Sequence, residues 1–158
     1  MKTIYIKNDI GVLQITGSVN GVERIRIDEN DSYEKSIVPE YLKKCVQEIE
    51  EYIQGTRTDF TFMMNPKGTD FQKKIWRIIN EVSFGKTATY IQIARIYGNT
   101  KAVRAVAAAI GKNPILVAIP CHRIIGSNGK LVGYAAGLHK KKWLLKNEGF
   151  SFQSEFSF

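Results

Sequence analysis

The sequence predicts a mixed α/β chain of the α+β type. A small N-terminal antiparallel sheet with one helix is followed by a mainly helical domain of winged helix-turn-helix type that carries Cys121. Apolar and polar residues alternate over the first third of the chain, helical periodicity begins at Pro39, and two short apolar-striped segments flank a glycine-containing turn at residues 97–100. Of the 158 residues, 44% are hydrophobic and 24% charged, which is enough for a packed core.

The first third of the chain supplies the sheet and its helix. Strands are expected at Thr3–Lys7, Val12–Thr16 and Val22–Asp28, because turn residues separate these alternating runs. A helix is expected to begin at Pro39 and to stop at Gly55. Its apolar face consists of Leu42, Cys45, Val46, Ile49 and Ile53. The cysteine in this stripe is interpreted as a buried small hydrophobic residue without a chemical role.

A change of charge accompanies the predicted domain boundary. Asn65-Pro66-Lys67-Gly68 is the best linker candidate, and it divides the chain into residues 1–66, residues 67–150 and a tail of residues 151–158. Residues 1–66 hold 8 basic and 11 acidic side chains (net −3), whereas residues 67–158 hold 15 and 4 (net +11). The basic part would attract a polyanion, most commonly nucleic acid, although a basic surface can also serve solubility alone.

The basic part is predicted to be mainly helical. Thr69 or Asp70 can cap a helix that ends before Ser83-Phe84-Gly85. Two short helices, an apolar strand or extended run, and a last helix follow. In order they are Tyr90–Ile96, Lys101–Ile110, the extended run Ile115–Ile119, and His139–Asn147. The tail alternates phenylalanine with polar residues and is interpreted as an added edge strand or a frayed end.

The two helices on either side of Tyr97-Gly98-Asn99-Thr100 are typical of a helix-turn-helix. On the second helix, one face combines positive charge with very small side chains. By their spacing, its members are Lys101, Arg104, Ala105, Ala108 and Lys112. A helix with its side chains is about 10–12 Å wide and the DNA minor groove about 6 Å, so only such a face could press against that groove. The alternative is a surface helix whose alanines merely favour helix formation.

The segment IPCHRIIGSNGKLVGYAAGL carries the candidate chemistry. Pro120 stiffens the end of the apolar run, and Cys121 follows it next to His122, a candidate base. Neighbouring side chains of an extended chain point apart, so a relay through a water is more natural than direct contact. The alternative is a buried structural cysteine beside a surface histidine, but Tyr134 and four glycines downstream favour a shaped loop beside the thiol.

Several other classes are disfavoured by the sequence. The thiols and imidazoles (Cys45, Cys121, His122 and His139) show no spacing typical of a zinc site. No apolar run approaches the roughly 18–20 residues of a membrane span, and the N-terminus does not resemble a signal peptide. Two cysteines do not make a disulfide scaffold, so we expect reduced thiols in the cytoplasm. There is no Walker loop, dinucleotide fingerprint or serine nucleophile elbow.

The stretch PCHR at residues 120–123 resembles the active-site signature of the O6-alkylguanine-DNA alkyltransferases. The resemblance extends over most of residues 69–149 through spaced motifs in the same order, whereas residues 1–66 match only in general layout. These motifs are SFGKTATY ending at Tyr90, KAVRAVAAAIGKNP around Arg104 and Asn113, IPCHRII, GYAAGL, and KKWLLKNEG with Glu148. One position departs from the family pattern, because Ala136 stands where a glycine is frequent, and this bears on the width of the base pocket.

The resemblance implies DNA repair by direct, irreversible and stoichiometric transfer of an alkyl group from O6-alkylguanine to the chain's own cysteine, and it leaves open whether O4-alkylthymine is a second substrate. Cys121 would accept the alkyl group, His122 would deprotonate it through a water, and Glu148 would orient the imidazole. Tyr90 would donate to the guanine ring, and Asn113 would brace the turn beside the site. The base pocket would be lined by Tyr134, Gly133, Ala135, Ala136 and Pro120.

The resemblance also implies how the chain meets DNA. Arg104 would enter the duplex from the helix-turn-helix and fill the space of the flipped, alkylated base. A monomer that uses no metal, no small-molecule cofactor and no membrane is expected to act once on double-stranded DNA. Two other functions are weighed against this one. They are a damage-binding protein of the alkyltransferase-like type, which lacks the reactive cysteine, and a plain helix-turn-helix regulator.

Overall fold

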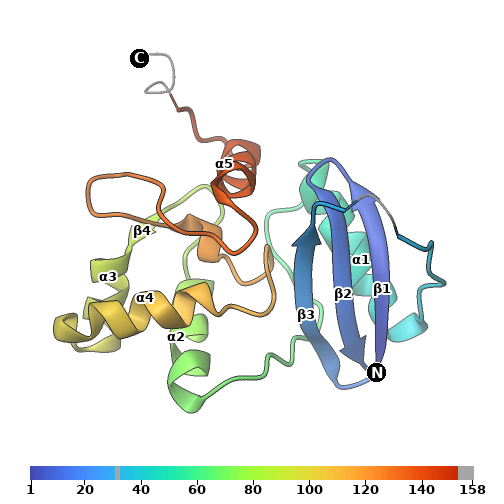
Figure 1. The fold of residues 1–158 in the computed structure, drawn as a ribbon, viewed down its shortest axis with the longest axis horizontal. Helices are drawn as coiled ribbons and strands as arrows, with labels where there is room; N and C mark the ends of the chain where they lie inside the picture. The colour runs from blue at the N-terminus through green and yellow to red at the C-terminus, as the bar shows by residue number, and fades with distance from the viewer. Residues whose placement is uncertain (31–32, 153–158) are drawn as a thin grey trace.

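Three antiparallel strands form the N-terminal sheet in the order β1–β2–β3 (Figure 1). The computed structural model describes residues 1–30 and 33–152. The strands are β1 Lys2–Asn8, β2 Gly11–Ser18 and β3 Gly21–Asp28. The register pairs Ile4 with Ile15 and Ile15 with Ile25, and all three side chains are buried. The predicted strands are therefore confirmed, with a residue or two added at most of their ends.

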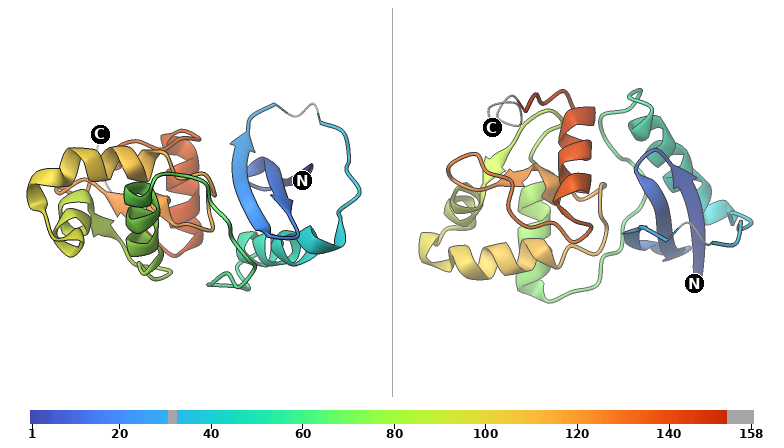
Figure 2. Two further views of the ribbon diagram at one scale, coloured as in Figure 1. Left: turned by 90° about the horizontal axis from the view of Figure 1, so that it is seen from below. Right: turned by 45° about the horizontal axis from the view of Figure 1, so that its top comes forward.

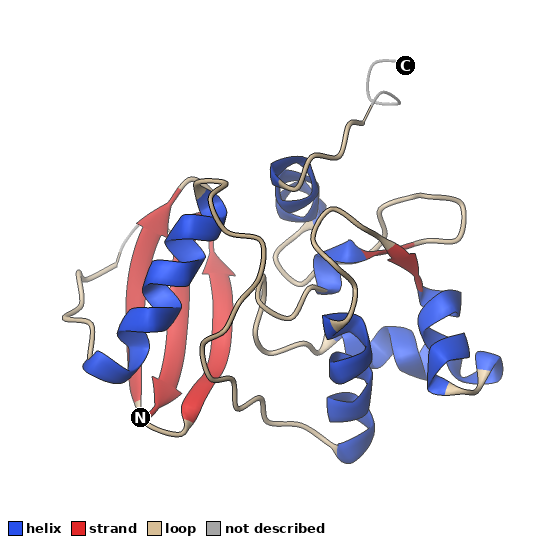
Figure 3. Ribbon diagram, turned by 180° about the vertical axis from the view of Figure 1, so that it is seen from behind, coloured by secondary structure: helices blue, strands red, loops and turns tan. Residues whose placement is uncertain are grey.

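Helix α1, Glu40–Ile53, covers one face of this sheet (Figure 3). Most of the apolar stripe predicted for it is buried, and Val46 is half-buried. Two further side chains of α1, Glu48 and Tyr52, are also buried. The apolar periodicity does not predict the burial of Glu48 and Tyr52, because the polar group of each is buried together with a hydrogen-bond partner.

The second part of the chain is mainly helical, as the sequence predicts. Its elements are α2 Asp70–Asn80, β4 Ala88–Thr89, α3 Tyr90–Tyr97, α4 Val103–Gly111, β5 Ile124–Ile125 and α5 Leu138–Asn147. A capping box opens α2, in which the Thr69 side chain and that of Gln72 each accept a backbone N–H. Thr89 and Gln92 open α3 in the same way. The short strands β4 and β5 pair in parallel.

The two parts share one continuous core. An extended segment between α1 and α2 crosses from the sheet to the helices (Figure 2), and the outer edge of β3 is paired to both parts. Val22 exchanges backbone hydrogen bonds with Met63 and Asn65. Ile25 accepts from the backbone of Leu116 and donates to Pro114. The sheet therefore holds the chain just before Cys121 in a fixed place.

The apolar run Ile115–Ile119 is extended only at its start, which corrects the expectation of a strand or extended run. Ile115 makes a single bridge to β3, and the backbone then turns. Val117 has a φ of +74°, the only positive value among the described non-glycine residues, and Ala118 donates across it to the carbonyl of Leu116. This strained γ-turn replaces the strand because Asn113 and the buried apolar side chains hold it closed.

Within residues 1–30 and 33–152, no helix is both long enough and apolar enough to cross a membrane. The prediction for the phenylalanine-rich tail falls on residues 151–158, of which 153–158 lie outside the described residues.

Candidate active site

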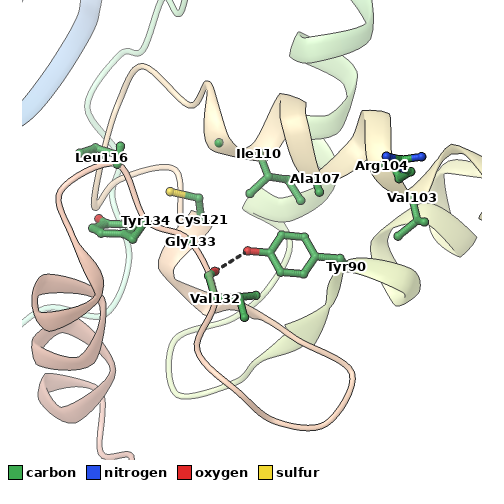
Figure 4. Close-up of a pocket in the computed structure, with 12 residues that line it drawn as sticks. Tyr90, Val103, Arg104, Ala107, Ile110, Leu116, Cys121, Val132, Gly133 and Tyr134 are labelled. Atoms are coloured by element: carbon green, nitrogen blue, oxygen red, sulfur yellow. Dashed lines mark hydrogen bonds between the residues drawn. The ribbon is translucent and has the colours of Figure 1, made fainter.

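A pocket of about 600 Å³ opens between α4 and the loop that follows β5 (Figure 4). Its size is in the range of small-molecule sites. The walls are mostly apolar, with polar groups from Tyr90, Arg104, Cys121 and Tyr134. The remaining lining residues are Val103, Ala107, Ile110, Gly111, Leu116, Val132, Gly133 and Ala135. One side chain with nucleophilic chemistry thus faces a cavity able to hold an organic ring.

Asn113 ties the turn before Cys121 together. Its side-chain amide donates to the carbonyl of Ile119 at 2.8 Å and to Cys121 Sγ at 3.1 Å, while its Oδ1 accepts from the backbone of Ile115 at 2.9 Å. Pro120 fixes the next turn, in which the Cys121 amide donates to Ile119 at 2.8 Å. The position of the sulfur is therefore set by backbone that has little freedom to move.

The Cys121 side chain is almost fully buried, and its protonation reflects this. Burial raises the pKa of Cys121 to about 11. The hydrogen bond from Asn113 and the positive charge of Lys141 favour the thiolate and offset part of this rise. A thiol with this pKa is protonated near neutral pH. It therefore needs a base before it can act as a nucleophile.

A buried base lies directly after the cysteine. Cys121–Arg123 form one turn of 3₁₀ helix, and the His122 side chain is fully buried. His122 Nε2 lies 2.7 Å from Glu148 Oε2. Arg123 Nε donates to Glu148 Oε1 at 2.8 Å, and Arg123 Nη2 to Oε2 at 3.0 Å. The carboxylate of Glu148, at the end of α5, thus binds both residues that follow Cys121.

The environment of Glu148 settles which nitrogen of His122 carries the proton. Burial would raise the pKa of Glu148, but hydrogen bonds from His122, Arg123 and Tyr52 outweigh it and lower this pKa to about 2. An ionised carboxylate only accepts hydrogen bonds, so Nε2 of neutral His122 must carry the hydrogen. Nδ1 is then the acceptor, and it is buried with no hydrogen-bond partner among the described residues. The pKa of His122 is lowered by burial, which keeps the ring neutral.

Lys141 of α5 shapes the loop on the other side of the pocket. Its fully buried ammonium donates to the carbonyls of Ile124, Val132 and Gly133 at 2.6, 3.0 and 3.1 Å. Burial lowers the pKa of Lys141 to about 8. These bonds hold the loop against α5, and they place a positive charge near the thiol of Cys121.

Two tyrosines border the thiol from opposite sides. Tyr90 lines the pocket and donates its hydroxyl to the carbonyl of Val132 at 3.0 Å (Figure 4). The Tyr134 hydroxyl is buried and has no partner in the described part of the chain. Burial raises the pKa of both groups, so both hydroxyls remain donors at neutral pH.

The structure separates the predicted site residues into three places. Tyr90, Arg104, Cys121, Gly133, Tyr134 and Ala135 line the pocket, whereas Asn113 binds the sulfur and His122 pairs with Glu148. Lys101, Arg104, Ala105, Ala108 and Lys112 are all exposed on or beside α4. Pro120 and Ala136 do not line the pocket, which corrects their assignment to its wall. Pro120 is buried behind the cysteine, and Ala136 packs against the core.

Sequence reasoning missed three polar residues of the site. Arg123 is part of the PCHR motif but received no role, although an arginine inside an apolar stretch signals a buried carboxylate partner. Lys141 is hidden in a run of three lysines, of which only this one is fully buried. Tyr52 lies almost a hundred residues before its partner Glu148, and nothing local in the sequence links the two.

Comparison with known proteins gives a consistent result. Residues 70–150 match the family described as 6-O-methylguanine DNA methyltransferase, DNA binding domain. A methylated-DNA–protein-cysteine methyltransferase of Methanosarcina acetivorans is 39% identical over 150 residues, which cover 90% of this chain and 95% of the relative. A probable enzyme of the same kind from Acanthamoeba polyphaga mimivirus is 42% identical over 149 residues, covering 94% of this chain and 97% of that one.

Solved structures agree with these relatives. The crystal structure of Mycobacterium tuberculosis OGT in complex with DNA has a TM-score of 0.84 and 35% identity, covering 92% of this chain and 91% of that one. The O6-methylguanine methyltransferase of the same organism has a TM-score of 0.82 and 32% identity over 98% of both chains. The overall fold of this chain thus matches these solved structures, and the chain belongs to the methylated-DNA–protein-cysteine methyltransferase family.

Proposed function

We propose that this chain repairs DNA by transferring the alkyl group of O6-alkylguanine irreversibly to Cys121. The observation that carries the proposal is the placement of the Cys121 thiol. Cys121 lines a base-sized pocket, and the buried His122–Glu148 pair begins at the next residue of the chain. A structural cysteine requires neither feature.

The proton path follows from the orientation of His122. A water bound between Cys121 Sγ and the unpartnered Nδ1 of His122 would pass the thiol proton to the ring, and Glu148 would stabilise the imidazolium that forms. Lys141 and Asn113 would stabilise the thiolate, since both already act on the sulfur. The raised pKa of the resting thiol also protects it from side reactions until substrate arrives.

The transfer step is a displacement at the alkyl carbon. The thiolate sulfur forms a bond to that carbon while the bond from carbon to O6 breaks, and guanine leaves with the bonding electrons. A proton must then reach the purine, and Tyr90 would donate to the ring once its hydroxyl leaves the Val132 carbonyl. The product thioether is stable, and the site has no group that would cleave it, so each chain would act once.

The target base must leave the helix to reach the pocket. Arg104 lies on the exposed side of α4 and also lines the pocket, so it is placed where the duplex and the flipped base would meet. Extruding a base costs a few kcal/mol, and less for a weakly paired, damaged base. We propose that Arg104 fills the emptied space while Ala105 and Ala108 approach the minor groove.

Two finer points extend the proposal. The same thiolate could displace an alkyl group from O4 of thymine, because the reacting carbon has the same kind of bond to oxygen. We also propose that the chain acts as a monomer, because the proposed transfer uses the nucleophile, base and carboxylate of a single chain.

Incubation with a duplex containing one O6-methylguanine tests the proposed function. We expect the protein mass to rise by one CH₂ group, as a methyl group replaces the thiol hydrogen, with loss of the lesion from the DNA. Damage-selective binding without a mass change would instead support a damage-binding protein. Binding to one defined undamaged sequence would support a regulator. The same assay with O4-methylthymine decides the second substrate.

A further inference from the structure

The N-terminal part of the molecule reaches the active-site carboxylate through one side chain. Tyr52 of α1 is fully buried, and its hydroxyl donates to Glu148 Oε2 at 2.6 Å. Burial and the charge of Glu148 both raise the pKa of Tyr52, so this phenol remains a donor at every working pH. The bond joins two residues that lie 96 positions apart in the chain.

The ring of Tyr52 is held in one orientation. It packs against Phe60 with centroids 5.3 Å apart, and it forms a T-shaped pair with Phe84 with centroids 6.1 Å apart. Asn147, the residue before Glu148, donates its side-chain amide to the Tyr52 carbonyl at 3.0 Å. The hydroxyl is therefore aimed at the carboxylate by packing on both sides and by a second bond to the end of α5.

Glu148 Oε2 is a crowded acceptor. It receives Tyr52 at 2.6 Å, His122 at 2.7 Å and Arg123 at 3.0 Å, while Oε1 receives Arg123 and the Gly85 amide. Donors that share one oxygen compete for its negative charge. The hydrogen bond from Tyr52 therefore weakens the hydrogen bond between His122 and the same oxygen.

We propose that Tyr52 is a positioning residue of the transfer reaction, which fixes Glu148 and limits how strongly it attracts a proton onto His122. The proposal rests on the proposed function for its kinetic readout. It makes the N-terminal sheet and helix part of the active site, because only α1 supplies this donor.

The direction of the effect follows from the charges around the pair. The titratable and charged groups near His122 and Glu148 are Tyr52 on α1, Arg123 beside His122, Lys141 on α5, and Cys121 and Tyr134 at the pocket. Tyr52→Phe removes one donor and leaves the others. Glu148 Oε2 then carries more charge toward His122, so protonated His122 is stabilised and its pKa rises.

The first test is the pH dependence of single-turnover transfer to Tyr52→Phe, with O6-benzylguanine as the free-base substrate. Protonated His122 cannot accept the thiol proton, so the acid side of the profile should move to higher pH. We expect the rate at a fixed pH on that side to fall by about threefold relative to the native chain. Nitrogen NMR of the His122 ring should show the same shift directly.

Two comparisons separate this role from a structural one. Tyr5→Phe removes a phenol from the same part of the molecule, where it accepts from Gln14 at 3.0 Å, and should leave the profile unchanged. Incorporation of 3-fluorotyrosine at position 52 keeps the ring and strengthens the donor. It should move the acid side of the profile to lower pH, the opposite direction.

The proposal is overturned if Tyr52→Phe folds and both its His122 titration and its pH profile match those of the native chain. It is also overturned if Tyr52→Phe and the 3-fluorotyrosine protein shift the pH profile in the same direction. Thermal melting checks folding, and the fluorinated protein supplies the answer if Tyr52→Phe does not fold. The NMR titration needs no alkyl transfer. An inactive native chain would therefore contradict the proposed function while leaving the Tyr52 coupling measurable.

Discussion

Glu148 accepts hydrogen bonds from His122, Arg123, Tyr52 and Gly85, which makes it the most heavily used acceptor in the site. Its lowered pKa links the chemistry to stability. A carboxyl group whose pKa is lower in the folded than in the unfolded chain stabilises the fold above its unfolded pKa, and this stabilisation is lost as the pH falls.

We therefore expect the free energy of unfolding to fall as the pH drops from about 4.5 toward 2, the span between the ordinary and the folded pKa of Glu148. The contribution is roughly 3 kcal/mol if the full shift is expressed. Urea unfolding at a series of pH values measures it, with Glu148→Gln as the comparison. An acid-side loss of the same size in Glu148→Gln would show that other groups cause it.

Arg104 allows a second test at the level of one residue. If its side chain replaces a flipped nucleotide, Arg104→Ala should slow repair of duplex DNA by about tenfold or more, yet change the rate with free O6-benzylguanine by less than about twofold. Lys101→Ala removes a charge nearby; it should weaken duplex binding, but the rate of duplex repair at saturating protein should be retained. Equal losses on duplex and free base for Arg104→Ala would show that Arg104 acts within the pocket and does not replace the flipped nucleotide.

Among the secondary-structure elements, helix α4 has two sides with different proposed roles. Its inner side (Val103, Ala107, Ile110) forms a wall of the pocket, and its outer side is exposed. Ala108→Leu adds bulk on the exposed side alone. We expect duplex affinity to fall by about tenfold, while the rate with free O6-benzylguanine is retained.

Gln47→Leu is the matched control, because it places a leucine on the exposed side of α1, away from α4. Fluorescence anisotropy with an undamaged duplex measures both variants. Native affinity in Ala108→Leu would argue that this side of α4 does not contact the groove.

Most elements were predictable because local rules decide them. Alternation predicted the strands, and Thr69 and Pro39 marked helix starts that the structure confirms to within a residue. Ile115–Ile119 was not predictable in this way, because periodicity does not distinguish a short apolar run in a strand from one in a buried turn. Its conformation depends on Asn113 and on β3, which are tertiary contacts.

The residues of the candidate site likewise differ in whether a local signal in the sequence identifies them. Cys121 and His122 are adjacent in the sequence and were found there, and Glu148 followed from the resemblance alone. Tyr52 and Lys141 act through long-range contacts to Glu148 and to the pocket loop. Such partners are visible only when the chain is folded.

At the scale of the whole molecule, charge is divided between the two parts of the chain. The net +11 of residues 67–158 should make affinity for undamaged duplex fall steeply with salt. With three cationic side chains on the α4 face, we expect log affinity against log salt to have a slope of about −3 or steeper, because each phosphate contact contributes about −0.9.

Lys112→Ala should reduce that slope by about 1, whereas Lys43→Ala in the N-terminal part should leave it unchanged. Titrations over a range of salt concentrations measure both slopes. A flat response would contradict duplex binding by this basic face, and a strong preference for one undamaged sequence would favour the regulator over the repair protein.

The location and number of the transferred methyl groups decide whether Cys121 is the acceptor. The native chain and its Cys45→Ala and Cys121→Ala variants are each incubated with an excess of duplex containing O6-methylguanine, and intact and peptide masses are recorded. We expect one methyl group per chain, on Cys121, in the native protein and in Cys45→Ala, and none in Cys121→Ala, which should still bind DNA. Methyl transfer to the Cys121→Ala protein, or more than one group on the native chain, would contradict this expectation.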